Sequence, residues 1–269
     1  MEESKINGII EDYSNGMSLK DIKNKYRTST DTIYKLIDKN GIARKTYKNL
    51  DKFYDLKNPE VQYWLGYICA DGNIQYSLKH RVYKVSLFSK DEEVLLEFKK
   101  CFGDIVRLHY RPTGIIEGYI NSKKLCEYFI NTLNITPNKS LTLDPKIEFT
   151  KNFILGYFDG DGSVMTSSET RTRYESKITG GSEIFINKVA QILKAEGIYY
   201  IIRSKGNAFD ISIERKEESK KFYKWLYTDK VWCLPRKLNT FVALFGNLEK
   251  NNRENCGELD GQSAAELSE

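Results

Sequence analysis

Two aspartates, whose carboxyl groups could take part in chemistry, lie at the ends of the two copies of a repeated apolar stretch. The first stretch covers residues 64–72 (WLGYICADG) and the second covers residues 154–162 (ILGYFDGDG). Asp71 and Asp161 hold the same place in the two copies. Carboxylate oxygens bind hard cations such as Mg²⁺, so two of them side by side would form a cation site.

The residues around the two stretches predict helices that stop where the acids stand. Asn58 and Pro59, ahead of the first stretch, are typical of a helix start, with Asn as the N-cap and Pro at the first helical position. Gly72 and Gly162 stand where helices commonly end, so we expect them at C-terminal caps. The negative ends of the two helix dipoles would then strengthen the attraction for a cation.

Small residues predict how the two helices meet. Gly66 and Ala70 are four residues apart in the first stretch, and so are Gly156 and Gly160 in the second. Residues four apart share one helix face, and small side chains there allow two helix backbones to approach closely. We therefore expect these residues to form a helix interface that brings the two acids together.

Composition narrows the class of protein. The chain has 269 residues, enough for two or three domains, and its net charge of +5 permits a polyanionic partner. No run of about 18 apolar residues is present, so no membrane span is predicted, and the first residues do not resemble a signal peptide. Five cysteines without a CxxC pair and two histidines argue against a structural zinc site and suit a reducing cytoplasm.

Residues 1–46 predict a small helical domain. Apolar residues recur at helical spacing in three short runs, separated by breaks at residues 15–16 and 28–29. Segment 15–22 (NGMSLKDI) resembles the helix-turn-helix of resolvases, which makes the last helix a recognition helix whose exposed residues would enter the DNA major groove. These residues are Thr30, Thr32, Tyr34 and Lys35. The alternative is a helical hairpin that packs against the rest of the chain and touches no DNA.

Residues 47–58 are predicted to form a basic linker. The basic residues in and around it are Arg44, Lys45, Lys48, Lys52 and Lys57. Two interpretations stay open: a solvated connector, or a connector that follows DNA phosphates. At the other end of the chain, the polar and acidic composition of residues 248–269 predicts a disordered tail.

Residues 59–247 contain an internal duplication, with halves at 59–147 and 148–247. After each apolar helix the sequence predicts a hairpin, a second helix, two more strands and a third helix. The later helices are expected at residues 90–102, 124–133, 182–195 and 216–227, and the later strands at 105–111, 118–121, 199–204 and 209–214. A repeat of this length is not a solenoid period, so we predict an α+β fold of two pseudo-symmetric α-β-β-α-β-β-α halves.

Two such motifs, at this spacing and with this order of elements, resemble the LAGLIDADG homing endonucleases in their single-chain, two-motif form. The resemblance covers residues 59–247. It implies that the motif helices form the interface between the halves and that the strands of each half form an antiparallel saddle over the DNA major groove. It also implies that the last acid of each motif, here Asp71 and Asp161, is catalytic and binds Mg²⁺ or Mn²⁺ at the scissile phosphates. The earlier acid position, a packing or capping position in the family, holds Cys69 in one copy and Asp159 in the other.

A second match to the family lies late in each half. Lys139 follows the third helix of the first half in segment 137–140 (PNKS), and Lys237 follows that of the second half in segment 234–237 (LPRK). Many family members carry a basic residue here that reaches the active site. The two lysines are therefore candidate catalytic residues that would stabilise developing charge or order a water molecule. A pair of solvated surface lysines is the alternative.

The predicted strands and hairpin tips carry basic residues that would contact DNA from alternating positions. Arginine favours guanine edges, and lysine more often contacts phosphate. The candidates are Lys79, Arg81, Lys84, Arg107, Arg111, Arg171, Arg173, Lys177, Arg203 and Lys205. The spacing alone leaves open which of them face the same way.

These features predict a site-specific, metal-dependent endonuclease for double-stranded DNA, acting as a monomer on a long asymmetric target with no protein partner. The alternative is a LAGLIDADG scaffold that binds without cutting, either an intron RNA maturase or a transcription regulator. The fold with a helix-turn-helix resembles the WhiA regulators, although theirs is C-terminal. Paired acids and paired lysines favour the endonuclease. Intein splice junctions are not recognised, which favours an intron-encoded or free-standing protein. An amino-acid composition rich in Lys, Asn and Ile suggests an AT-rich genome, that of a bacterium or its phage.

Overall fold

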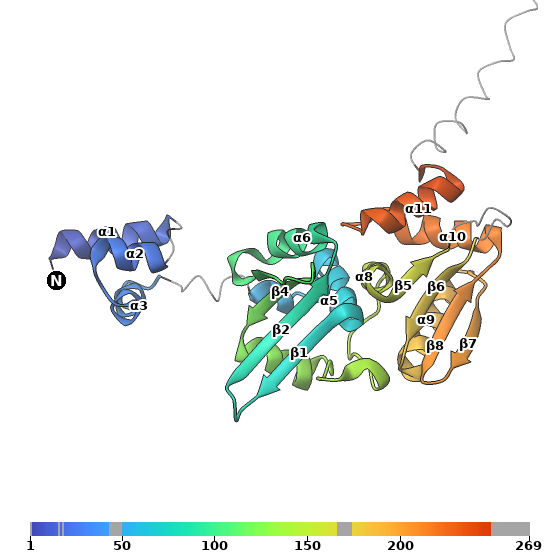
Figure 1. The fold of residues 1–269 in the computed structure, drawn as a ribbon, viewed down its shortest axis with the longest axis horizontal. Helices are drawn as coiled ribbons and strands as arrows, with labels where there is room; N and C mark the ends of the chain where they lie inside the picture. The colour runs from blue at the N-terminus through green and yellow to red at the C-terminus, as the bar shows by residue number, and fades with distance from the viewer. Residues whose placement is uncertain (1, 16, 18, 43–49, 166–173, 249–269) are drawn as a thin grey trace, which may run out of the picture. The chain divides into compact units, whose positions relative to one another are not determined.

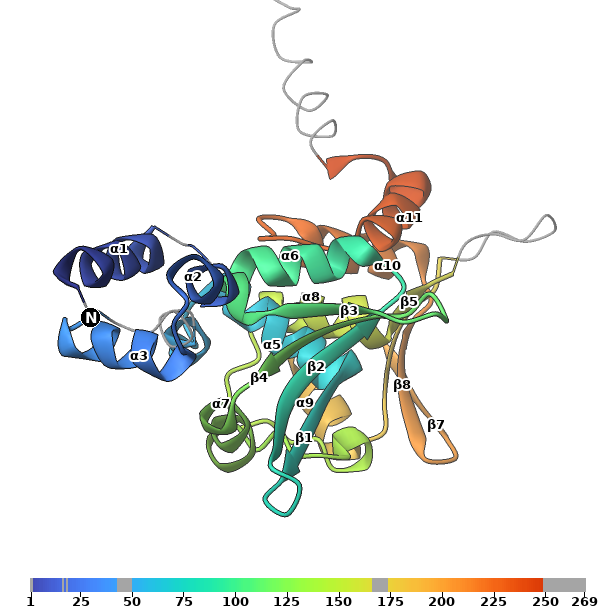
Figure 2. The same cartoon turned by 60° about the vertical axis from the view of Figure 1, so that its left-hand side comes forward.

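The computed structural model describes residues 2–15, 17, 19–42, 50–165 and 174–248 (Figures 1 and 2). These residues fall into two units. One lies within Met1–Tyr54 and also takes in Phe102–Ile105, and the other comprises the described part of Asp55–Cys101 and Val106–Glu269. No helix among the described residues is long and apolar enough to cross a bilayer.

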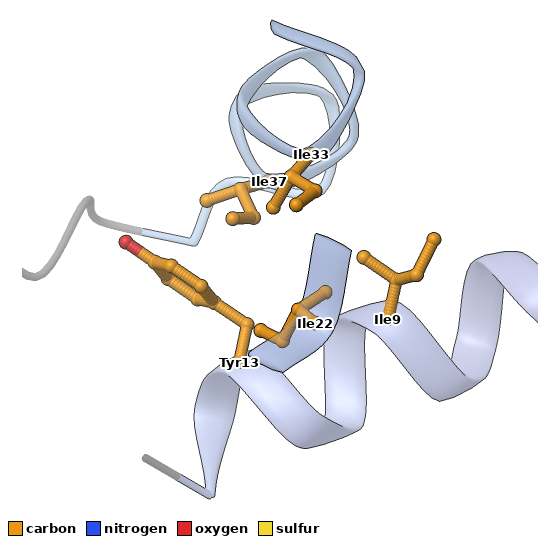
Figure 3. Close-up of a cluster of buried hydrophobic side chains, with 5 residues drawn as sticks. All are labelled: Ile9, Tyr13, Ile22, Ile33 and Ile37. Carbon is orange, nitrogen blue, oxygen red and sulfur yellow. The ribbon is translucent and has the colours of Figure 1, made fainter. Parts of the chain in front are cut away.

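The first unit contains the three expected helices, each with an apolar stripe turned toward the others. They are α1 (Glu3–Ser14), α2 (Leu19–Tyr26) and α3 (Thr30–Lys39). The buried side chains they share are Ile9, Tyr13, Ile22, Ile33 and Ile37, which gather in Figure 3. A short turn joins α2 to α3: Arg27 has a φ of 44°, and the hydroxyl of Ser29 caps α3 by accepting from the N–H of Thr32 at 3.1 Å.

Two residues inside the expected linker, Leu50 and Phe53, are packed rather than solvated. Phe53 lies in the 3₁₀ turn η1 (Asp51–Tyr54), and both side chains are buried. The ring of Phe53 stacks on that of Phe102, with centroids 3.8 Å apart. The solvated interpretation is therefore wrong for these residues, because two apolar side chains outweigh the basic composition around them. Of the basic positions singled out, Arg44, Lys45 and Lys48 lie outside the described residues.

In the second unit, both motif stretches form helices with polar caps at their first residues. The side chain of Asn58 accepts from the N–H groups of Glu60 and Val61 at 2.9 and 3.3 Å and so caps α5 (Pro59–Asp71). The hydroxyl of Thr150 accepts from the N–H of Phe153 at 3.2 Å and caps α8 (Lys151–Asp161). Such caps satisfy N–H groups that have no partner inside the helix.

Each half then follows the same order of elements. The first half continues as β1 (Gly72–Ser77), β2 (Val82–Ser89), α6 (Glu92–Phe102), β3 (Arg107–Tyr110), β4 (Ile116–Asn121) and α7 (Lys123–Glu127). The second continues as β5 (Gly162–Val164), β6 (Ser176–Gly180), α9 (Glu183–Ala195), β7 (Ile201–Lys205), β8 (Ala208–Ile213) and α10 (Lys216–Tyr227). This order confirms the predicted α+β fold of two pseudo-symmetric halves.

The strands form two antiparallel sheets with equivalent topology. Their strand orders are β1-β2-β4-β3 and β5-β6-β8-β7. In Figure 1, α5 and α8 lie side by side between the two sheets, and α9 packs on β6 and β8. One face of each sheet therefore lies against helices, while no helix within the described ranges covers the other.

Gly72 and Gly162 are the C-cap residues of α5 and α8, as predicted. Their φ values are −80° and −90°, so their backbone is extended and each helix runs directly into a strand. Both must be glycine for a steric reason, because a Cβ would lie 2.4 Å from the carbonyl oxygen of Ile68 or Phe158. The third helix of the first half ends as a π-helix, η3 (Tyr128–Thr132).

An additional helix, α11 (Pro235–Phe245), was not predicted from the sequence pattern. Pro235 begins it, as proline can at a first helical position. The first half has only the 3₁₀ turn η4 (Lys139–Leu141), preceded by Asn138 at a φ of 57°. The duplication is therefore unequal at its ends.

The packing of α5 on α8 depends on residues without side chains. A Cβ on Gly66 would lie 1.9 Å from the carbonyl oxygen of Phe153, and one on Gly156 would lie 1.8 Å from that of Tyr63. A Cβ on Gly160 would lie 2.4 Å from that of Ala70. The two backbones are thus in direct contact, which fixes the distance between the helices and between their last residues, Asp71 and Asp161.

Substitution of Gly156 by alanine tests this contact. The added methyl group meets backbone that only a shift of the whole helix can relieve, so we expect the free energy of unfolding to fall by about 3 kcal/mol. Alanine's better helix propensity, about 1 kcal/mol, does not offset this. Gly118→Ala is the control, since the nearest atoms to its added methyl group belong to side chains, the closest being a flexible methyl of Leu95 at 3.1 Å. Urea denaturation measures both; equal small losses would contradict the backbone contact.

Candidate functional site

The two acids of the repeated motif lie together where α5 and α8 end. A Cβ built on Gly160 would lie 3.4 Å from Oδ2 of Asp71, and Asp161 is the next residue along α8. Both acidic side chains are open to solvent on one side. The helix packing therefore places two carboxylates, and the negative ends of two helix dipoles, at one point.

Both carboxyls have raised pKa values. Loss of surrounding water is the main cause for Asp161, whose pKa rises to about 6; the charge of Asp71 adds to the rise, while Lys139 and Lys237 oppose it. Loss of water also raises the pKa of Asp71, against the effect of Lys237, Lys139 and Arg236. Two carboxylates that repel each other in poorly hydrated surroundings favour the binding of a cation between them.

Lys139 and Lys237 are both buried next to these acids. The Nζ of Lys139 donates to the carbonyl oxygen of Gly72, at the end of its own half's helix. The Nζ of Lys237 donates to the carbonyl oxygens of Phe158 and Asp159, the latter at 2.8 Å. Burial lowers the pKa of both lysines, that of Lys237 to about 8, while nearby carboxylates counteract the shift. Each lysine is therefore held by backbone carbonyl oxygen at the C-terminal end of its own half's motif helix, although at different positions, and neither is a solvated surface lysine.

Arg236 is a third cation at this site, which the sequence reading passed over. Its Nε donates to Oδ2 of Asp91, a residue of the first half, at 2.9 Å. The residues that line a hollow beside it are Gly162, Ser163, Val164, Arg236, Lys237 and Thr240. Its position directly before Lys237 in the sequence is the signal that could have identified Arg236 as a residue of this site. The first half has Asn138 before Lys139, so this cation belongs to one half alone.

The donor set at the helix ends fits a magnesium-type ion rather than a closed protein cage. Among the described residues, no three His, Cys, Asp or Glu side chains gather around one point. Mg²⁺ is commonly held by one or two carboxylates, with waters and substrate phosphate oxygens completing its shell. Asp71 and Asp161, both partly open to solvent, supply that number of carboxylates.

The earlier acid position behaves differently in the two copies. Asp159 is fully buried, and its Oδ2 accepts from the hydroxyl of Tyr63 at 2.8 Å and from the N–H of Leu234 at 2.7 Å. Burial raises its pKa to about 6. In the other copy, burial raises the pKa of the Cys69 thiol to about 12, and Phe153 takes the place equivalent to Tyr63. In the repeat, Cys69 and Phe153 thus replace both the acid and its hydroxyl donor. The hydrogen bond between the halves at this position therefore forms once, from Tyr63 to Asp159, and not at the equivalent pair.

Strand register shows which basic residues share the helix-free faces. Val85 is buried and pairs with Ile74 and Ile120, so the alternate residue Lys84 points to the other face. By the same alternation, the basic residues on the helix-free faces are Lys84, Arg107, Lys177, Arg203 and Lys205. Lys79 and Arg81 lie in the turn between β1 and β2, and Arg111 follows β3.

Four of these cations are paired with acids. Lys84 and Arg111 both contact Glu117, at 2.6 and 3.0 Å, Lys177 contacts Glu175 at 3.0 Å, and Arg203 contacts Glu214. Arg171 and Arg173 lie outside the described residues. The basic character of the sheets is therefore partly balanced within the protein.

The candidates on α3 differ in accessibility. Lys35 is exposed, whereas Thr30 and Thr32 are half-buried. The hydroxyl of Thr32 lies 2.9 Å from that of Ser29, so it already has a partner in the helix cap. Lys35 is the candidate most free to meet another molecule.

Comparisons with known proteins agree with the fold. Residues 148–226 match the family model described as a LAGLIDADG-like domain. In solved structures, the chain is similar to the LAGLIDADG homing endonuclease I-SmaMI bound to cleaved DNA, with a TM-score of 0.51, 13% identity, and coverage of 75% of this chain and 92% of that one. It is also similar to the LAGLIDADG meganuclease I-AabMI bound to uncleaved DNA, with a TM-score of 0.50, 12% identity, and coverage of 72% and 92%.

One curated relative is similar in sequence. It is the DNA-directed RNA polymerase subunit Rpo1C of Methanocaldococcus jannaschii, 28% identical over 171 residues. The match takes in 60% of this chain but only 18% of that subunit. This chain thus spans a small part of the relative's length.

Replacing Tyr63 with phenylalanine tests the buried link between the halves. The change removes a hydrogen bond to a buried carboxylate, so we expect the free energy of unfolding to fall by about 2 kcal/mol. Tyr110→Phe is the matched control: Tyr110 donates to Glu92 at 2.7 Å on an exposed surface, and its loss should cost below about 0.5 kcal/mol. Thermal and urea unfolding measure both variants, and a Tyr63→Phe protein as stable as the unmodified chain would refute the role of Asp159.

Proposed function

Since the chain has the LAGLIDADG homing-endonuclease fold that its sequence predicted, we propose that it is a site-specific endonuclease that cuts both strands of duplex DNA with a divalent metal. The observation that carries the proposal is the placement of Asp71 and Asp161 at the ends of two helices in backbone contact. Two buried lysines stand beside them. A scaffold for binding alone has no need of two buried lysines beside a pair of carboxylates.

Each residue of the cluster has a role in phosphodiester hydrolysis. Asp71 and Asp161 would hold Mg²⁺ or Mn²⁺. The bound ion supplies Lewis-acid stabilisation of the phosphate and a water molecule of lowered pKa. Lys139 and Lys237, fixed by backbone carbonyl oxygens, keep positive charge where negative charge develops on the phosphate oxygens. Because these groups are already held in place, little reorganisation accompanies the reaction.

The helix-free faces of the two sheets are the proposed DNA-binding surface. Their cations favour the phosphate backbone and guanine edges, and antiparallel strands suit a major groove. The two faces carry different residues, which favours an asymmetric target read by one copy of the chain. Arg236 and Asp159, each present in one half only, give the two sides of the catalytic centre different surroundings.

Cleavage of a randomised DNA library, sequenced at the new ends, tests this function. With Mg²⁺ we expect one asymmetric target cut in both strands, and EDTA should abolish the cutting. Asp71→Asn and Asp161→Asn should each lower the rate by at least about a hundredfold, since each removes a charged metal ligand.

Asp229→Asn is the matched control for these variants, because Asp229 is exposed and its φ of 53° suits asparagine equally well. It should cut at the unmodified rate. Specific binding of a sequence without cutting by the unmodified protein would instead support the binding-only alternative.

The three-helix domain is proposed to extend the contact with DNA through α3. Lys35→Glu reverses the charge of its accessible basic residue, so we expect affinity to fall about tenfold and the hydroxyl-radical footprint to shorten at one end, with the cleavage position unchanged. Lys194→Glu, the same change at the exposed end of α9, should leave the footprint intact. A Lys35→Glu footprint identical to that of the unmodified protein would remove this domain from DNA recognition.

A further inference from the structure

Glu117 is a carboxylate in an unexpected place. It lies on β4, paired with Phe88 of β2 and His109 of β3, on the helix-free face of the first sheet. It is nevertheless 4% exposed. An acid on a surface that meets DNA repels phosphate, and burying a charge without partners is costly. Its presence therefore calls for a compensating role.

Two cations use both oxygens of this carboxylate. Oε1 accepts from the Nζ of Lys84 at 2.6 Å, and Oε2 accepts from Nη2 of Arg111 at 3.0 Å. These hydrogen bonds keep the pKa of Glu117 below its ordinary value although burial acts in the opposite direction. The carboxylate is thus charged and neutralised by its neighbours.

Aromatic rings hold the same two cations from a second side. The guanidinium carbon of Arg111 lies 4.9 Å from the ring centre of Phe88, and the Nζ of Lys84 lies 5.4 Å from that of Tyr119. A guanidinium carries five N–H donors in a fixed plane, so one bonded edge leaves donors for another acceptor. The side chain of Arg111 stays 43% exposed.

We propose that Glu117 is a positioning residue for base recognition, which holds Arg111 and Lys84 to read guanine in one half of the DNA target. Arginine and lysine donate to O6 and N7 of guanine, the commonest base-specific contact in the major groove. A long side chain fixed before binding loses less conformational freedom when it binds. This inference rests on the proposed function of the sheets as the DNA-binding surface.

The second half provides an internal comparison. Asp210 occupies the equivalent place, paired with Thr179 and Arg203 across the strands. Its Oδ1 accepts from the hydroxyl of Thr179 at 2.7 Å, while Arg203 donates to Glu214 instead. Among the residues that the structure describes, an acid shared by two cations is therefore built at this place in the first sheet and not in the second. The guanine preference should be confined to one half of the target.

Selection of bound duplexes from a randomised library, with EDTA present so that DNA stays intact, tests the inference. We expect the unmodified protein to enrich guanine at one or two positions of one half-site. In Glu117→Gln, which keeps the shape but removes the charge that fixes the cations, that preference should fall about tenfold. Affinity for non-specific DNA should stay level or rise, since a negative charge is removed; a purely structural role would lower both.

Two further variants make the result decisive. Asp210→Asn should leave the guanine positions of the first half-site unchanged. Arg111→Met removes every N–H donor of this side chain, so it should lose the same guanine preference, and it tests the base contact if Glu117→Gln does not fold. An unaltered base preference in Glu117→Gln or in Arg111→Met would overturn this inference alone. Enrichment of no sequence by the unmodified protein would overturn the proposed function as well.

Discussion

The direct contact between the backbones of α5 and α8 is the constraint on which the rest of the structure depends. It exists because Gly66 and Gly156 present no Cβ, so that each helix meets the carbonyl oxygens of the other. Helices with ordinary side chains at the contact stay about 8–10 Å apart, and these two lie closer than larger residues would allow. The distance between the two helices therefore sets the distance between the acids at their ends. It also sets the distance between the two sheets, which begin one residue later at Gly72 and Gly162.

The site at the helix ends is built from charges that would each be unfavourable alone. Two carboxylates and two helix C-termini repel one another, and the loss of water raises the pKa of both acids. Lys139 and Lys237 offset part of that repulsion, and each donates to backbone carbonyl oxygen at the end of a motif helix. A bound cation compensates the carboxylates, and a phosphate compensates the lysines, better than water does. The arrangement therefore suits phosphoryl chemistry.

Much of this could be predicted from the residues, because the information is local or repeated. The apolar motif with its small residues predicts a close helix pair, and its repetition predicts two acids at one place. Following the repeat to its end also identifies Lys139 and Lys237. Periodicity further predicts the order of elements, although boundaries shift by a few residues where caps such as Ser122 and Ser182 decide them.

Other features depended on contacts between residues far apart in the chain. Helix α11 has no counterpart in the first half, so the repeat argued against it, while Pro235 and the buried Phe241 favour it. The ion pair of Arg236 with Asp91 joins the two halves. The burial of Glu117 depends on strand register, and a shift of one residue would turn its side chain to the opposite face. None of these is visible from spacing alone.

We propose that the close packing of α5 and α8 places the carboxylates of Asp71 and Asp161 so that they hold one catalytic metal site on DNA. Anomalous scattering from Mn²⁺ in crystals of the protein with a selected duplex tests this placement most directly. We expect manganese peaks in contact with oxygens of both Asp71 and Asp161 and with a DNA phosphate. Manganese bound elsewhere, or no peak at these acids while DNA lies on the two sheets, would contradict it.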